Sequence, residues 1–248
     1  MKSNRFCMFL ATTMLGISLL AGGCSKGGGG MADDDEEPDM EYPDQVPGTI
    51  PGFGEADGEP EGTAFVLPEG VELVEAIRGN ENGPEDECLF DGPGYNVVVK
   101  IKLRRTIPGG SPLRVEFPAG LVIVTTTEGR NQNGLLVEKT IVELPPLVQG
   151  GGGSRCDITL LLLCTNQKRD PSSSYHTYKF GPVTNAPLIR DFVKRLQGKK
   201  INFSDYTPEQ EEEMLEIQQI VQEALYALTD GHGYNPYLLA QLAGLPNR

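Results

Sequence analysis

The clearest hydrophobic pattern in the chain is a strict alternation over YNVVVKIKLRR, residues 95–105. Every second side chain is apolar: Val97, Val99, Ile101 and Leu103. The residues between them are mostly polar or charged: Asn96, Lys100, Lys102 and Arg104. Alternation with a period of two over this length predicts a β-strand with one buried and one solvated face.

Other stretches of the first two thirds also have the character of strands. They are LVEAIR near Leu73, LRVEF, LVIVTTT, GLLVEKTIVEL, CDITLLLLCTN and YHTYKF near Tyr175. CDITLLLLCTN is apolar on both faces, which predicts a central strand covered on each side. GLLVEKTIVEL either contains a bulge or is two-sided. Six or seven short strands with Gly/Pro punctuation and no crossover helices predict an immunoglobulin-like antiparallel β-sandwich.

The last third changes to a helical period. APLIRDFVKRLQG, residues 186–198, places five apolar side chains on one stripe and ends at a glycine. A longer helix follows Thr207, with Pro208 at its first position and Gln210 completing a capping box. A short helix is expected over 236–243. The fold class is therefore mainly β with C-terminal α, with two or three helices packed on the sandwich.

The first thirty residues have the layout of an export signal. Lys2 and Arg5 precede an apolar segment over 6–21, and small residues follow. The segment has 16 residues, whereas a membrane span needs about 20. We therefore interpret residues 1–23 as a signal peptide that is removed.

The small residues after this segment lead to Cys24, in the order Leu20-Ala21-Gly22-Gly23-Cys24. This resembles the lipobox of bacterial lipoprotein signal peptides, although Leu20 stands four residues before the cysteine where the family usually has Leu at three. The resemblance implies that Cys24 is lipidated and becomes the first residue of the mature protein. It also implies that this lipid attaches the protein to the outer membrane. The alternative is ordinary signal cleavage nearby, with Cys24 a spare thiol.

Residues 24–62 are acidic and rich in Gly and Pro. From Ser25 onward they hold twelve carboxylates and one base, Lys26, and so little apolar surface predicts a disordered tether. An acidic stretch after a lipidated cysteine also resembles the surface-export signal of Bacteroidetes lipoproteins, which implies display on the cell surface. The predicted domains that follow are a β-sandwich over 63–183 and a helical segment over 184–248.

The charge balance changes once the tether is set aside. The chain has a formal net charge of −14, but without the signal and tether 23 acidic and 18 basic residues remain. No dense basic cluster is available to neutralise phosphates, so nucleic acid is not expected as a partner.

Three cysteines lie in the predicted folded part: Cys88, Cys156 and Cys164. In an exported protein, pairing is the default. Cys156 and Cys164 are eight residues apart on one strand, about 26 Å, which is too far for a disulfide. Cys88 therefore pairs with one of them or with neither. We favour Cys164 as the better buried partner, with Cys156 as the alternative.

No nucleophile motif, paired-carboxylate motif, metal-ligand spacing or dinucleotide fingerprint appears in the sequence, so no catalytic residue, metal or cofactor is predicted. Asp230 and His232 could each bind a metal ion, but the loop that holds them is better explained as the end of the preceding helix. Exposed aromatic contacts are expected at Tyr175, Tyr178, Tyr234 and Tyr237. Trp is absent, which weakens a carbohydrate-binding interpretation without removing it.

A strand that ends LLCTNQ, a Pro-rich step and a helix that reads ALYALTD follow one another in the folded part. This order, over about Phe117 to Asp230, is similar to uncharacterised secreted bacterial domains that join an immunoglobulin-like sandwich to a helical tail. We expect a lipid-anchored cell-envelope protein that binds protein or glycan or has a structural role, and that is not an enzyme. The alternatives are an envelope hydrolase using dispersed carboxylates and a subunit of a surface assembly.

Overall fold

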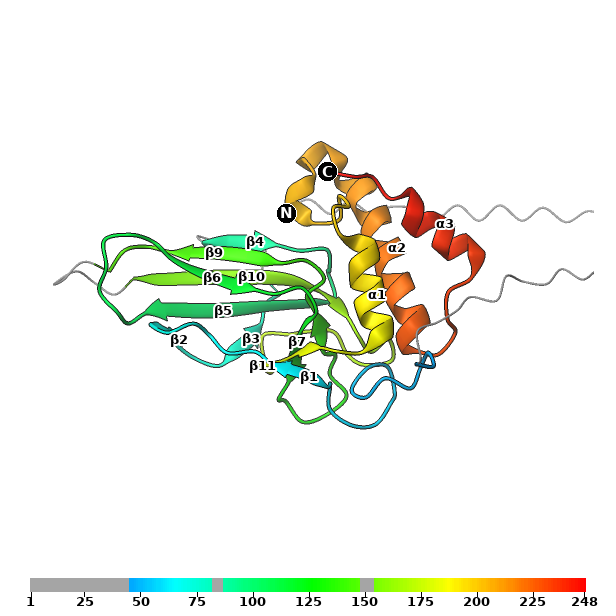
Figure 1. Cartoon of the computed structure of the whole chain (residues 1–248), viewed down its shortest axis with the longest axis horizontal. Helices are drawn as coiled ribbons and strands as arrows, with labels where there is room; N and C mark the ends of the chain where they lie inside the picture. The colour runs from blue at the N-terminus through cyan, green and yellow to red at the C-terminus, as the bar shows by residue number, and fades with distance from the viewer. Residues whose placement is uncertain (1–44, 82–86, 148–153) are drawn as a thin grey trace, which may run out of the picture. The chain divides into compact units, whose positions relative to one another are not determined.

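A computed structural model describes residues 45–81, 87–147 and 154–248 of the chain (Figure 1). The predicted signal peptide and Cys24 lie outside these residues. The described residues belong to one compact unit, with strands first and helices last, as the sequence predicts. The strands are β1 (Gly62–Ala64), β2 (Val71–Leu73), β3 (Ile77–Gly79), β4 (Leu89–Asp91), β5 (Val97–Arg105), β6 (Leu113–Phe117), β7 (Leu121–Thr125), β8 (Gly134–Leu135), β9 (Thr140–Leu144), β10 (Arg155–Cys164) and β11 (Thr177–Thr184).

The main sheet closes on itself. Its strand order is β2-β5-β3-β11-β7-β8-β10-β4, and β5 also pairs with β10, so β5, β3, β11, β7, β8 and β10 form a six-stranded ring. β6 and β9 form a separate two-stranded sheet. The prediction of an immunoglobulin-like sandwich was therefore too specific. The mainly β part is a closed barrel, because β5 is paired along both of its edges.

β5 and β10 form the longest seam of the barrel. Their antiparallel register runs from Arg155 opposite Arg104 to Leu162 opposite Val97. The alternation predicted for β5 is confirmed, since Val97, Val99, Ile101 and Leu103 are buried and Lys100 and Lys102 are not. β10 is buried over most of its length, as predicted for a central strand.

Two of the predicted strands are broken in the structure. LVEAIR divides between β2 and β3, which pair with different parts of the same edge of β5. GLLVEKTIVEL divides between β8, which belongs to the barrel, and β9, which pairs with β6. Residues 136–138 between them are buried, so this short segment, which includes the charged Glu138, is the crossing from one sheet to the other.

The helices are α1 (Pro187–Leu196), α2 (Glu211–Thr229) and α3 (Pro236–Gly244), with short 3-10 turns at Phe203–Asp205 and Pro208–Gln210. The apolar face of α2 is buried, including Met214, Val221, Leu225 and Leu228. That face therefore packs inside the chain. Gln222 on α2 also hydrogen-bonds both backbone groups of Cys164 at the end of β10, at 2.9 Å and 2.7 Å.

Part of the predicted tether is folded. Ile50 and Phe53 are buried, and the Gly48 amide donates to the Leu228 carbonyl at 2.8 Å. Asn133 and Asn166 donate side-chain hydrogen bonds to the carbonyls of Gly52 and Gly54. The prediction of disorder through Gly62 is wrong for the described residues 45–62, because buried amides of the barrel bind this backbone. The rest of the tether lies outside the described residues.

The disulfide joins Cys88 to Cys156, with Cα atoms 5.6 Å apart, so the favoured pairing with Cys164 is wrong and the alternative is right. The reason is register. β4 runs parallel to β10 with Leu89 opposite Ile158, which places Cys88 beside the first residues of β10. Cys164 lies at the opposite end of that strand and is free and buried.

Candidate functional site

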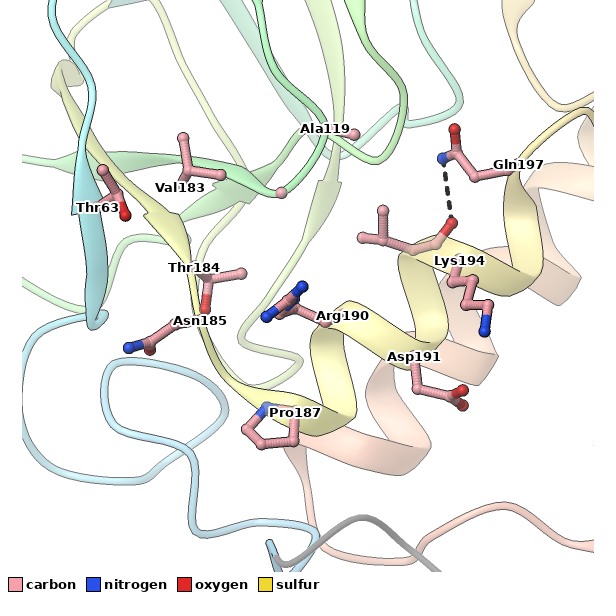
Figure 2. A pocket seen from close by; sticks show the side chains of 12 residues that line it. Thr63, Ala119, Val183, Thr184, Asn185, Pro187, Arg190, Asp191, Lys194 and Gln197 are labelled. Carbon is pink, nitrogen blue, oxygen red and sulfur yellow. Dashed lines mark hydrogen bonds between the residues drawn. The ribbon is translucent and has the colours of Figure 1, made fainter.

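A groove of about 770 Å³ runs between α1 and the adjoining ends of β1, β7 and β11 (Figure 2). We call it the α1 groove. It is lined by Thr63, Ala119, Gly120, Val183, Thr184, Asn185, Pro187, Arg190, Asp191, Val193, Lys194 and Gln197.

The position of α1 follows from its sequence. The helix begins at Pro187, which fits the first helical turn because its missing N–H would have no partner there. Leu188, Ile189, Phe192 and Leu196 form the buried stripe. Burying this stripe turns the remaining faces of the helix outward, and Arg190, Val193 and Lys194 thereby become one wall of the groove.

The opposite wall is made by the barrel. The turn before β7 is tied to β11 by the Thr184 amide, which donates to the Gly120 carbonyl at 2.9 Å. Gly120 has φ of 87°, a conformation that a side chain would strain, and its amide donates to the Leu136 carbonyl at 2.7 Å. These bonds fix the barrel wall of the groove.

Polar side chains lie at both ends of the groove. The Thr184 hydroxyl accepts a hydrogen bond from the Ala186 amide at 3.2 Å and retains its own O–H as a donor. Gln197 donates to the carbonyls of Val137 and Val193, both at 3.1 Å, so its side-chain oxygen remains an acceptor. Val183, Val193 and Ala119 add apolar side chains to the lining. This mixture of apolar walls and a few polar groups is typical of a ligand site.

The charges of the groove are mainly positive. Asp191 is engaged by Arg195, whose Nε lies 2.6 Å from the carboxylate. Arg190 points from α1 into the space beside Thr184 and Asn185 (Figure 2), and neither it nor Lys194 has an acidic partner within the described part of the chain. The groove is therefore locally cationic on a chain whose net charge is negative.

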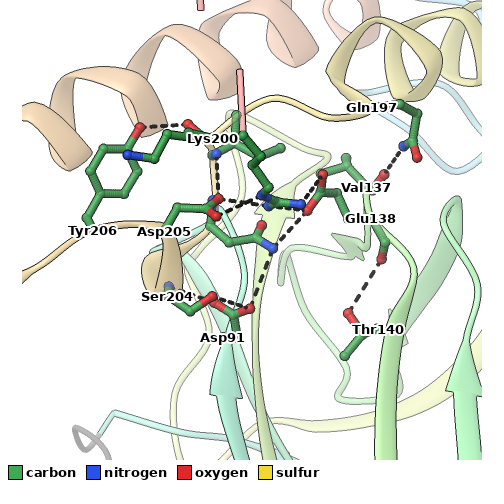
Figure 3. A network of polar contacts seen from close by, with 12 residues as sticks. Asp91, Val137, Glu138, Thr140, Gln197, Lys200, Ser204, Asp205 and Tyr206 are labelled. Atoms are coloured by element: carbon green, nitrogen blue, oxygen red, sulfur yellow. Dashed lines mark hydrogen bonds and ion pairs between the residues drawn. The ribbon is translucent and has the colours of Figure 1, made fainter. Parts of the chain in front are cut away.

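Away from the groove, Arg248 bridges two carboxylates, Glu138 and Asp205. Arg248 Nη2 is 2.6 Å from Glu138 Oε2, and its Nε is 2.7 Å from Asp205 Oδ1. Asn202 donates to Glu138 at 2.8 Å. Nearby, the Ser204 amide and hydroxyl both donate to Asp91 at 2.9 Å (Figure 3).

The two carboxylates of this network differ in acidity. Burial raises the pKa of Glu138 above its ordinary value, against the opposing effect of Arg248. Burial acts in the same direction on Asp205, but hydrogen bonds from Arg248 and from the Asn202 and Ile201 amides lower its pKa overall. Both carboxylates are bound by one guanidinium, so the geometry is that of an ion-pair network holding loops together.

The four tyrosines predicted as contacts separate into two groups. Tyr175 and Tyr237 are exposed, at 86% and 72%. Tyr178 and Tyr234 are 3% and 8% exposed, so their predicted exposure is wrong. Tyr178 occupies a buried position of β11, and Arg195 lies over the Tyr234 ring, 5.9 Å from its centroid. None of the four lines the α1 groove.

The loop with Asp230 and His232 has the geometry of a helix stop. α2 ends at Thr229, and Gly231 and Gly233 have φ of 92° and 68°. Over residues 45–81, 87–147 and 154–248, no group of three or more His, Cys, Asp or Glu residues is placed to hold a metal ion. Within the same residues, no helix has the length and hydrophobicity that crossing a membrane would require.

Sequence reasoning did not find the groove residues. Arg190 and Lys194 occupy the polar positions of a helix that the sequence identifies only by its apolar stripe. Thr184 ends β11 and Asn185 follows it, and no motif marks either residue. The only sequence signal for a site was that Arg190 and Lys194, on the polar side of the helix, are both basic. No protein-family model, no curated protein and no solved structure matches the chain.

Proposed function

We propose that this protein is a non-catalytic binding protein of the bacterial cell envelope, attached to the outer membrane through a lipid on Cys24 and using the α1 groove to hold its partner. The α1 groove is the observation that carries the binding role. It has walls fixed by hydrogen bonds, apolar lining side chains, polar groups with hydrogen-bonding capacity left, and two cations that have no acidic partner among the described residues. The lipobox-like sequence before Cys24 supports the anchor.

The anchor has a physical basis. Each buried methylene of an acyl chain contributes about 0.8 kcal/mol, and stable attachment requires more than one chain. The lipoprotein resemblance implies several chains on one cysteine, which would hold the protein without a membrane-spanning segment. The acidic stretch after Cys24 supports placement at the cell surface.

Metabolic labelling with a palmitate analogue tests the anchor. We expect label in the wild-type protein and none in Cys24→Ser. Persistent label in that variant would contradict lipidation at Cys24. Cys164→Ser is the matched control, because that cysteine is buried and its replacement should leave the label unchanged.

Site-specific photocrosslinking in intact cells tests the groove. A photoreactive amino acid placed at Asn185 or at Gln197 reaches the groove from either end, since both residues line it and both are exposed. The proposal predicts one crosslinked species common to both positions. The control position is Leu215, 48% exposed on α2, and should not yield that species. Identical products from all three positions, or none from the groove, would contradict binding there.

A further inference from the structure

Arg190 is the group of the α1 groove that most restricts the chemistry of a ligand. Its side chain points into the groove (Figure 2), and nothing in the described residues forms an ion pair or a side-chain hydrogen bond with it. Several other arginines of the described residues are paired, as Arg104 is with Glu72 and Arg130 with Glu55. A planar guanidinium presents donors in a fork that matches a carboxylate or a phosphate.

The surroundings of Arg190 favour an anion further. Lys194, four residues later on the same helix, adds a second positive charge. The acidic residue between them, Asp191, is occupied by Arg195. A ligand carboxylate beside Arg190 would therefore meet two cations and no unpaired acid of the groove lining.

The rest of the lining distinguishes a peptide from a saccharide. The groove contains no aromatic side chain on which a sugar ring could stack. It has instead apolar patches at Val183 and Val193, suited to aliphatic side chains, and hydrogen-bonding groups at Thr184 and Gln197, suited to a peptide backbone. The positive charge favours an acidic ligand, and the apolar–polar mixture without an aromatic platform favours a peptide over a saccharide.

We infer that the α1 groove binds an extended peptide segment of a partner protein, with a carboxylate of that segment held by the Arg190 guanidinium. This inference rests on the proposed function, since it names the ligand of the same groove. Arg190 is the anchor, Lys194 provides a second positive charge, and the apolar walls select the residues beside the acidic one.

Selection from a random library of twelve-residue peptides by the purified full chain tests this assignment. The wild-type protein should enrich peptides with Asp or Glu at one position. Arg190→Gln should weaken binding of the selected peptides by about tenfold or more, as expected for loss of a charge-assisted pair. Arg190→Glu should reverse the preference and enrich Lys or Arg at that position.

Arg155→Gln is the matched control, because Arg155 is an exposed arginine of β10 that does not line the groove. It should retain the wild-type acidic preference. Unchanged thermal unfolding of all variants establishes that each one folds. Enrichment without acidic residues, or acidic enrichment that survives in Arg190→Gln, would overturn the inference.

Two further results separate the inference from the function on which it rests. If crosslinks form from Asn185 and Gln197 in cells but no acidic peptide is selected, the groove binds something else and only the inference fails. If those crosslinks are absent, the proposed function itself fails. Arg190-dependent binding of an oligogalacturonate, tested in parallel, would assign the groove to acidic glycans and overturn the peptide assignment.

Discussion

Gln222 of α2 makes both of its hydrogen bonds to a single residue of the barrel, Cys164. Its side-chain oxygen accepts from the Cys164 amide at 2.9 Å, and its side-chain nitrogen donates to the Cys164 carbonyl at 2.7 Å. The primary amide thus takes the place of a neighbouring strand at the end of β10. Because Gln222 is 2% exposed, water cannot replace these bonds.

Gln222→Ala should therefore destabilise the protein. The substitution leaves a buried N–H and a buried C=O unpaired, and each costs about 1–3 kcal/mol. We expect the free energy of unfolding in urea to fall by about 2–4 kcal/mol. The matched control is Gln219→Ala, since Gln219 is exposed and its side chain donates to Glu223 one turn later. That variant should stay within about 0.5 kcal/mol of wild type, and equal losses in both variants would contradict the argument.

The bridge from Arg248 to Asp205 should make stability depend on pH. Because the pKa of Asp205 is lowered in the folded state, the carboxylate contributes stability above its unfolded value of about 4 and loses it as the pH falls through the folded pKa. Asp205→Asn should cost about 1 kcal/mol at pH 7. The difference between wild type and variant should shrink below about pH 4, as measured by urea unfolding at each pH.

Glu138 should show the opposite trend, although it binds the same guanidinium. Its pKa is raised in the folded state by burial, so folding favours its protonated form. Its contribution to stability is present below its unfolded value of about 4.3 and is lost as the pH rises through the folded pKa. Relative to Glu138→Gln, the wild-type protein should therefore gain stability on acidification. Parallel pH trends in the Asp205 and Glu138 variants would contradict the separate environments of the two carboxylates.

The Cys88–Cys156 disulfide closes a long loop, with a sequence separation of 68. In the chain-entropy model, closing a loop of this length stabilises the folded state by about 4 kcal/mol. Cys88→Ser and Cys156→Ser should each lower the free energy of unfolding by a few kcal/mol, and the double variant should cost no more than either single one. Peptide mapping without reduction should recover Cys88 linked to Cys156. A peptide linking Cys88 to Cys164 would contradict the structure.

Cys164 should remain a free thiol that reacts slowly. It is buried, and burial raises its pKa to about 11, so little thiolate forms near neutral pH. In native protein we expect iodoacetamide to leave the peptide containing Cys164 unmodified, and to modify it fully after unfolding in urea. Rapid modification of the native protein would show that this end of the barrel opens readily.

The sequence patterns predict the individual strands of this protein better than they predict that the sheet closes into a barrel. The alternation from Val97 to Leu103 identifies β5 because side-chain period is a local property. The barrel closes because both edges of β5 are paired. That pairing depends on how β5 aligns with strands far away in the sequence, which the hydrophobic period of one strand does not encode. The same limit explains the disulfide, since the choice of Cys156 follows from the alignment of Leu89 with Ile158.

The candidate site was missed for a related reason. The apolar stripe shows which side of α1 is buried. It does not show which strands lie opposite the polar side of the helix, so the sequence alone could not place Arg190 beside Thr184.

The composition of residues 45–61 gives no sign that this segment packs on the barrel. Few apolar residues mark that segment, and much of its attachment comes from backbone groups bound by the buried amides of Asn133 and Asn166.

Gly54→Ala should show how far this segment contributes to the fold. Gly54 has φ of 57°, and a Cβ at this position would lie 1.9 Å from the Thr229 carbonyl oxygen. Since that clash is with backbone, the segment must move. The hydrogen bond that the Gly54 amide donates to the Thr165 carbonyl should then be lost, together with the one that Asn166 donates to the Gly54 carbonyl. We expect a loss of about 3 kcal/mol or more in the free energy of unfolding. In the matched control, Gly110→Ala, no atom lies within 4 Å of the new Cβ, so its stability should stay near wild type. A neutral Gly54→Ala would mean that residues 45–61 add little to the stability of the barrel.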